Sequence, residues 1–245
     1  MDPSLNAFAV HGGLSTTELR ELGDRGFVVV PGPVSSGDEL RQLAQAYDSA
    51  VAAADCVDVS IGRTTTRVHD FVNRGPEFDK LYVHKAALEA CCHVLGRAFK
   101  LSAMLARTLR PHSPAQDLHL DFKRDGDGWP MLGFIFMVDD FRADNGATRF
   151  VPGSHEWFDG PDDLIAQKET SRRSQVLACG PAGSMILYNG SVWHGHSANA
   201  SDTPRRSIQG SYIWREAQSG IEFAPRMRSD TLARIGPLAK YLLAV

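Results

Sequence analysis

Cysteine is scarce in this sequence. Its 245 residues include four cysteines, and no two of them have the C-x-x-C spacing of a zinc knuckle or a redox pair. Two of the four are adjacent in a segment expected to be helical, which does not suit a disulfide framework. We therefore expect buried thiols rather than disulfides or a zinc site. The four are Cys56, Cys91, Cys92 and Cys179.

Dense basic runs and long apolar runs are also missing. The 26 Lys and Arg residues against 29 Asp and Glu residues give a net charge of −3, which favours neither nucleic acid nor an anionic membrane surface as a partner. No window approaches the roughly 18 consecutive apolar residues of a membrane span. The N-terminal segment does not have the pattern of a secretory signal peptide. We therefore expect a cytoplasmic protein with no membrane contact.

The N-terminal part, residues 1–99, is expected to form a largely helical cover. Ser15 and Ser36 are each followed three residues later by glutamate, which is the spacing of a capping box and marks the start of a helix. Between these two helices, "GFVVVPGP" predicts a short strand that is ended by Gly and Pro. A further helix is expected at about residues 84–98.

Residues 100–215 consist of short apolar or alternating runs, such as "KLSAMLARTL", "MLGFIFMV" and "SMILY", separated by turn residues. Closely spaced strands of this kind predict a mainly β fold, a sandwich or barrel, with flanking helices that cover one face. We expect one domain over residues 1–245, with its core at residues 100–215 and a C-terminal tail at residues 216–245. The tail is expected to form a helix that docks on the body or contacts a second subunit.

The run "DLHLDF" places His119 and Asp121 two residues apart. In a strand, side chains at this spacing leave the same face of the sheet and can converge on one ion. With nine histidines and 29 acidic residues, about one such pair is expected by chance, so the motif alone also fits a surface strand. A third donor, His194, follows several expected strands later, and a barrel can bring distant strands side by side. Two imidazoles and one carboxylate are the ligands of non-haem Fe(II) oxygenases.

Four segments, "QDLHLDF", "NGATRFVPGSHEW", "VWHGHSAN" and "PRRS", occur in an order and spacing that resembles the phytanoyl-CoA dioxygenase-like family of Fe(II)- and 2-oxoglutarate-dependent oxygenases. The resemblance extends over roughly residues 100–215 and implies a double-stranded β-helix, which is a cupin-like jelly roll. It also implies that His119, Asp121 and His194 bind the iron and form the catalytic centre.

The resemblance further implies a site for the cosubstrate. Arg205, eleven residues after the second histidine ligand, matches the arginine that pairs with the distal carboxylate of 2-oxoglutarate, and its planar fork suits a carboxylate. Gln116 and Thr148 match positions that contact the cosubstrate. Ser207 is expected on the same strand face as Arg205, where it would add a hydroxyl, while Arg206 would point to the other side.

His196 departs from the family, whose members often have a small residue such as serine at this position. By strand alternation, His194 and His196 could face the same side. A cupin-like site with three histidines and one aspartate that does not use 2-oxoglutarate therefore stays open. A jelly roll that only binds a ligand, without catalysis, is the other alternative.

Other polar residues have simpler interpretations. His155, in "VPGSHEW", is expected in a turn. Arg67 and His69 fit a substrate mouth and a polar loop equally well. Arg107 lies in an apolar strand, where a buried cation normally needs a partner, so it is a candidate to face the active site. The arginines expected on a solvated surface are Arg172, Arg173, Arg226 and Arg228.

The expected function is that of a dioxygenase that uses Fe(II), 2-oxoglutarate and O2. The family resemblance implies hydroxylation of an unactivated C–H bond in a small organic molecule, with release of succinate and CO2. Related halogenases lack the carboxylate ligand, so Asp121 disfavours halogenation. Desaturation, ring closure and epoxidation stay open, as do the identity of the substrate and the oligomeric state.

Overall fold

Two antiparallel sheets form the body of the protein, and the computed structural model describes residues 12–34, 36–157 and 174–245. Within these residues the larger sheet has seven strands in the order β1-β8-β5-β10-β4-β3-β2, and the smaller has three in the order β7-β6-β9. The strands of the larger sheet are β1 Phe27–Pro31, β2 Val59–Ile61, β3 Thr65–Val68, β4 Phe99–Leu109, β5 Met131–Met137, β8 Ser184–Asn189 and β10 Arg205–Trp214. Those of the smaller sheet are β6 Thr148–Phe150, β7 Val176–Ala178 and β9 His194–His196.

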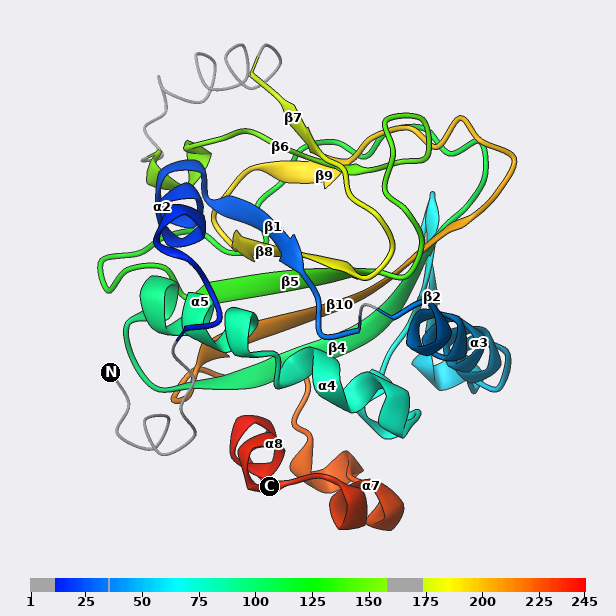
Figure 1. Cartoon of the computed structure of the whole chain (residues 1–245). Helices are drawn as coiled ribbons and strands as arrows, with labels where there is room; N and C mark the ends of the chain where they lie inside the picture. The colour runs from blue at the N-terminus through cyan, green and yellow to red at the C-terminus, as the bar shows by residue number, and fades with distance from the viewer. Residues whose placement is uncertain (1–11, 35, 158–173) are drawn as a thin grey trace.

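An apolar layer joins the two sheets, which lie one above the other in Figure 1. Phe27 and Ile186 of the larger sheet are buried in this layer together with Phe150 and Ala178 of the smaller sheet. The rings of Phe27 and Phe150 stack with their centroids 4.2 Å apart. Two antiparallel sheets packed face to face in this way form a jelly roll, so the predicted mainly β, cupin-like fold is confirmed.

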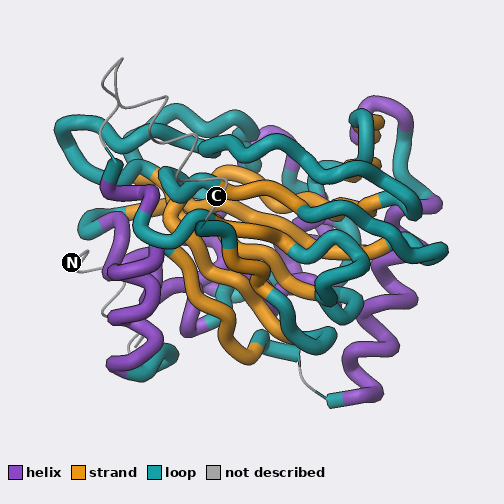
Figure 2. The backbone as a smooth tube through the Cα atoms, turned by 90° about the horizontal axis from the view of Figure 1, so that it is seen from above, coloured by secondary structure: helices purple, strands orange, loops and turns teal. Residues whose placement is uncertain are grey.

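Helices cover the face of the larger sheet that points away from the smaller sheet. They are α2 Thr16–Arg25, α3 Gly37–Ala52, α4 Asp79–Tyr82, α5 Lys85–Leu95, α7 Ser229–Arg234 and α8 Pro237–Leu243. Single 3-10 turns lie at η1 Cys56–Asp58, η2 Phe71–Asn73, η3 Pro76–Phe78, η4 Ser154–Glu156 and η5 Ala224–Arg226. Helix α5 packs on β5, β8 and β10, and α8 packs on β4, so the C-terminal tail docks on the body as expected. In Figure 2 the strands occupy the middle of the molecule with helices around them.

Across the described residues, no helix combines the length and the apolar character that crossing a membrane requires.

Both helix starts predicted from the sequence are confirmed. Ser15 Oγ accepts a hydrogen bond from the backbone of Glu18 at 3.2 Å, and the Glu18 side chain accepts one from the backbone of Ser15 at 2.7 Å, which completes a capping box. Ser36 Oγ likewise accepts from the backbone three residues later. The expected cover, residues 1–99, is not only helical, however. Its strands β1, β2 and β3 all join the larger sheet, and the division of the chain into cover, core and tail stays a prediction.

The run "DLHLDF" is not a strand, which corrects the prediction made from strand alternation. His119 and His194 form an isolated bridge, in which each backbone N–H donates to the other residue's carbonyl at 2.9 and 3.0 Å. At Asp121 the backbone N–H donates instead to Gly190 at 3.0 Å, so the chain bends towards the turn before β9. Gly195 permits this approach, because a Cβ there would lie only 3.1 Å from the carbonyl oxygen of Asp117.

Candidate metal centre

Three predicted ligands come together between the two sheets. Potential ligand atoms of His119, Asp121 and His194 all lie within 4.8 Å of one another. Nε2 of His119 is 3.8 Å from Asp121 Oδ1, and Nε2 of His194 is 3.7 Å from Asp121 Oδ2. The structure therefore places two imidazoles and one carboxylate around one point, although the histidine and aspartate of "DLHLDF" belong to a loop rather than a strand.

The two imidazoles are oriented by backbone carbonyls. Nδ1 of His119 lies 3.2 Å from the carbonyl oxygen of Asp117, and Nδ1 of His194 lies 3.0 Å from that of Val192. If each Nδ1 carries the proton and donates it to the carbonyl, each Nε2 presents its lone pair to the centre. Burial lowers the pKa of His194, which also favours the neutral, ligating form.

Tyr188 on β8 holds the carboxylate, and the sequence analysis did not find this residue. Its hydroxyl donates to Asp121 Oδ2 at 2.7 Å, and its ring centroid lies 5.0 Å from that of His194. The position opposite on β5 is Gly133, where a Cβ would come within 2.2 Å of the tyrosine ring, so glycine provides the space. Burial raises the pKa of Tyr188, so its hydroxyl keeps the proton that it donates. A buried tyrosine normally needs a hydrogen-bond partner, and this was the available signal in "SMILYN".

Arg205 on β10 lines a cavity that two of the three candidate ligands, Asp121 and His194, also line. It is 2% exposed, and its guanidinium stacks 4.0 Å from the ring centroid of Phe141. Nε and Nη1 have no hydrogen-bond partner within the described residues. Burial, together with the positive charge of Arg107, lowers the pKa of Arg205 to about 9, so the side chain stays protonated at neutral pH. A buried cation with unused donors fits the carboxylate of a bound acid.

The other predicted cosubstrate contacts divide into two groups. Gln116 and Thr148 line the Arg205 cavity, as the sequence analysis expected. Ser207 is fully buried and is not among the lining residues, because its hydroxyl donates to the carbonyl of Arg107 at 3.2 Å. The hydroxyl thus contacts the backbone of β4 rather than the cavity.

His196 lines the Arg205 cavity but is not grouped with the three candidate ligands. Its Nε2 lies 2.9 Å from Thr64 Oγ1, and its Nδ1 lies 2.8 Å from the carbonyl oxygen of Ser197. Burial lowers the pKa of His196 to about 4, so the ring is neutral at physiological pH. Both ring nitrogens have partners outside the group, which argues against the alternative of a three-histidine site.

Arg206 points away from the cavity, as expected from strand alternation. Its guanidinium lies 2.7 Å from Asp139 Oδ1 and 2.8 Å from Asp48 Oδ2. The hydrogen bonds that Arg206 donates to Asp139, opposed by burial, raise the pKa of Arg206 above its usual value. Alternation along β10 thus separates an unpaired, buried Arg205 from a paired, partly exposed Arg206.

His155 is more deeply placed than the turn prediction implied. It does lie in the 3-10 turn η4, but it is 2% exposed and its Nε2 is 3.0 Å from the carbonyl oxygen of Gly23. Burial by α2 makes it part of the packing and not part of the candidate metal centre. Arg226 and Arg228 are exposed, as predicted, while Arg172 and Arg173 lie outside the described residues.

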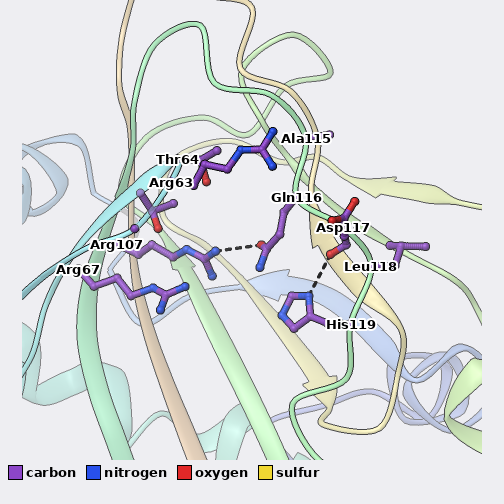
Figure 3. A pocket seen from close by; sticks show the side chains of 11 residues that line it. Arg63, Thr64, Arg67, Arg107, Ala115, Gln116, Asp117, Leu118 and His119 are labelled. Carbon is purple, nitrogen blue, oxygen red and sulfur yellow. Dashed lines mark hydrogen bonds between the residues drawn. The ribbon is translucent and has the colours of Figure 1, made fainter.

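A second cavity, of about 370 Å³, is lined by His119. Arg67 of β3 and Arg107 of β4 both line it, together with Gln116, and Figure 3 shows their side chains around the same space. His69 is not among the lining residues, because its Nε2 pairs with Ser60 Oγ at 3.1 Å. Of the residues considered for a substrate mouth, the two arginines therefore reach the cavity and the histidine does not.

A jelly roll with two histidines, one aspartate and a buried unpaired arginine has the fold and side chains of the two-histidine-one-carboxylate class of metalloproteins. Residues 23–207 match the family described as phytanoyl-CoA dioxygenase (PhyH). The chain belongs to this family, which confirms the resemblance found in the sequence.

Individual relatives agree with this assignment. Dioxygenase cdmA of Talaromyces verruculosus is 32% identical over 170 residues, which are 63% of this chain and 55% of that protein. The chain thus spans little more than half the length of this relative. EctD from S. alaskensis with bound Fe has a TM-score of 0.70 at 18% identity, covering 83% of this chain and 78% of EctD. HygX from Streptomyces hygroscopicus, with nickel and 2-oxoglutarate bound, has a TM-score of 0.67 at 17% identity, covering 86% and 93%. At these identities the two structures show a shared fold.

Proposed function

We propose that this protein is a non-haem Fe(II)- and 2-oxoglutarate-dependent dioxygenase that hydroxylates an unactivated C–H bond of a small organic molecule. One observation carries the proposal. The unpaired guanidinium of buried Arg205 opens into the cavity that His194 and Asp121 also line. A metal-binding group and an anion-binding group that line one cavity suit a ligand that chelates iron and ends in a carboxylate.

In this proposal His119, Asp121 and His194 hold Fe(II), and Arg205 binds the distal carboxylate of 2-oxoglutarate. Gln116 and Thr148 contact the cosubstrate from the walls of the cavity, a role that their position supports. Ser207, whose hydroxyl donates to the backbone of β4, supports the cavity wall from behind. When bound, iron and 2-oxoglutarate supply oxidation by O2 coupled to the release of succinate and CO2.

The protein itself orients the metal-binding side chains and encloses the cavity. Tyr188 keeps one carboxylate oxygen of Asp121 in place, and the backbone carbonyls keep both imidazoles turned towards the centre. Phe141 and Ile135 exclude water around Arg205, which strengthens its attraction for an anion. The second cavity beside His119 supports a small-molecule substrate, and we propose that its target C–H bond lies there.

We also propose that the enzyme acts in the cytoplasm. The four cysteines all belong to the described part of the chain, and all are thiols rather than disulfides. Only Cys91 is fully buried, while Cys56 and Cys179 are exposed, which corrects the expectation of buried thiols. Thiols are the usual state in a reducing compartment, which supports this location. Export of the protein to an oxidising compartment in its native cells would contradict the location and leave the proposed chemistry unaffected.

The test is anaerobic addition of Fe(II) and 2-oxoglutarate to the purified protein, followed by admission of O2. The proposal predicts a weak visible charge-transfer band that needs both additions, and then succinate release. A jelly roll that binds metal without using 2-oxoglutarate would retain iron and show neither signal. Folded wild-type protein that binds iron but gives no band at saturating 2-oxoglutarate would refute the proposal.

A further inference from the structure

Positive charge gathers at the second cavity, the one beside His119. Of the described residues that line it, three are arginines, Arg63, Arg67 and Arg107, and one, Asp117, is a carboxylate. Arg67 and Arg107 are direct partners in the register of β3 and β4, so their side chains leave the same face of the sheet. Figure 3 shows both guanidinium groups pointing into the space bordered by Gln116 and His119.

Two like charges directly opposite one another in a sheet destabilise the fold unless something compensates them. No carboxylate among the described residues forms an ion pair with either arginine. Arg107 donates to the neutral amide oxygens of Gln116 and Gln209 at 3.0 and 3.3 Å, and its buried Nε has no partner in the described part of the chain. Burial and the charge of Arg67 lower the pKa of Arg107 to about 10, so Arg107 stays a cation at neutral pH.

Two other partly buried arginines of the fold are each paired with an aspartate. The guanidinium groups of Arg74 and Arg206 each lie 2.7 Å from an aspartate oxygen. The Arg67–Arg107 pair differs from Arg74 and Arg206 in having a cavity where each of those two has a carboxylate. An anion that enters the cavity would supply the missing partner.

We infer that Arg67 and Arg107 bind a carboxylate group of the primary substrate, so that the substrate class is small organic acids. This inference rests on the proposed function, because it takes the cavity beside His119 as the substrate site. The cosubstrate has a separate partner in Arg205, which lines the other cavity, whereas Arg67 lines only this one. Arg107 borders both cavities and separates the two anions.

The test uses protein loaded with Ni(II) and saturating 2-oxoglutarate, which occupies the Arg205 cavity without turnover. Hexanoate, benzoate and hydrocinnamate are each titrated by calorimetry beside the matching primary amide. Wild-type protein is expected to bind at least one acid about tenfold more tightly than its amide. Arg67→Gln is expected to remove this preference and leave the dissociation constant of 2-oxoglutarate unchanged. Arg67→Lys, which keeps the charge, is expected to keep part of the preference.

Arg20→Gln is the matched control, because it removes one positive charge from the exposed face of α2. It is expected to retain the acid preference. Equal binding of every acid and its amide by wild-type protein would overturn the inference. So would an Arg67→Gln variant, folded by circular dichroism, whose main defect is weaker binding of 2-oxoglutarate, since the pair would then serve the cosubstrate.

The same titrations without metal and 2-oxoglutarate separate this inference from the proposed function. If the protein prefers acids in a way that depends on Arg67 but never binds 2-oxoglutarate, the anion site is supported and the proposed dioxygenase function is refuted. If the protein releases succinate normally but shows no preference for acids, the dioxygenase function is supported and the anion site is refuted.

Discussion

The hydrogen bond from Tyr188 to Asp121 leads to a prediction about iron affinity. Tyr188→Phe removes only the hydroxyl that donates to Asp121 Oδ2 at 2.7 Å, while the ring, 5% exposed, keeps its packing against His194. A hydrogen bond to a charged group contributes roughly 1.5–3 kcal/mol. Loss of an outer partner of a metal ligand typically weakens metal binding by about 10- to 100-fold. We expect the dissociation constant of Fe(II) to rise by that factor.

The assay is anaerobic Fe(II) titration with a chelator of known affinity, together with the visible spectrum of the complex with 2-oxoglutarate. Tyr212→Phe is the matched control. Its hydroxyl is also buried and also donates at 2.7 Å, but to the backbone carbonyl of Tyr82 on the helix side of the sheet. Tyr212→Phe is expected to lose about 1 kcal/mol of unfolding free energy, and Tyr188→Phe about 1.5–3 kcal/mol because its partner is charged. Only Tyr188→Phe is expected to weaken iron binding and to shift the charge-transfer band.

An iron dissociation constant for Tyr188→Phe within about twofold of that for Tyr212→Phe would refute this reasoning, because the factor expected for an outer partner is at least about tenfold. It would mean that Asp121 is held by the ion and the backbone alone. A loss of iron in both variants would attribute the effect to general destabilisation. The two proteins therefore separate a positioning role from a packing role.

Three further predictions concern the ligand set, the cosubstrate and the outward arginine. His194→Ala is expected to abolish iron binding, whereas His196→Ala is expected to retain iron. The measurement is bound metal per protein, and equal loss of iron in both variants would overturn the assignment of ligands. Arg205→Ala is expected to raise the 2-oxoglutarate concentration for half-maximal succinate release by at least about tenfold with iron binding unchanged, and an unchanged requirement would move the role elsewhere. Asp139→Asn is expected to lower the unfolding free energy by about 1 kcal/mol, because Arg206 donates to that partly buried carboxylate from its backbone nitrogen and two guanidinium nitrogens. The 2-oxoglutarate requirement of this variant is expected to be normal.

The candidate ligands could be predicted because metal-binding side chains at family spacing are visible in the sequence itself. Strand alternation also separated Arg205 from Arg206 correctly, since β10 is regular at these positions. Strand alternation also predicted that the side chains of His119 and Asp121 converge. They do converge, but not because they lie on a strand. These two residues lie in a loop, and their convergence comes from backbone bonds to His194 and Gly190.

Contacts between distant strands could not be predicted, because local sequence does not encode the register of one strand against another. Tyr188 reaches Asp121 only because Gly133 lies opposite on β5. Arg67 and Arg107 become neighbours only when β3 pairs with β4, forty positions apart in the sequence. Taken alone, Tyr188 fits a core tyrosine, Arg67 fits a polar loop, and Arg107 is a single cation in an apolar strand.

The two sheets carry different parts of the site, and this arrangement bears on how specificity can change. His194 belongs to the smaller sheet, and the loop with His119 is bridged to it. The arginines Arg67, Arg107 and Arg205 all belong to the larger sheet, on the adjacent strands β3, β4 and β10. Strand β3 pairs with β2 and β4, and neither strand holds a candidate ligand. Substitution at Arg67 is therefore expected to change which acid binds without loss of iron. Substitution on β9 would instead alter metal and cosubstrate together, because His194 lines the Arg205 cavity as well.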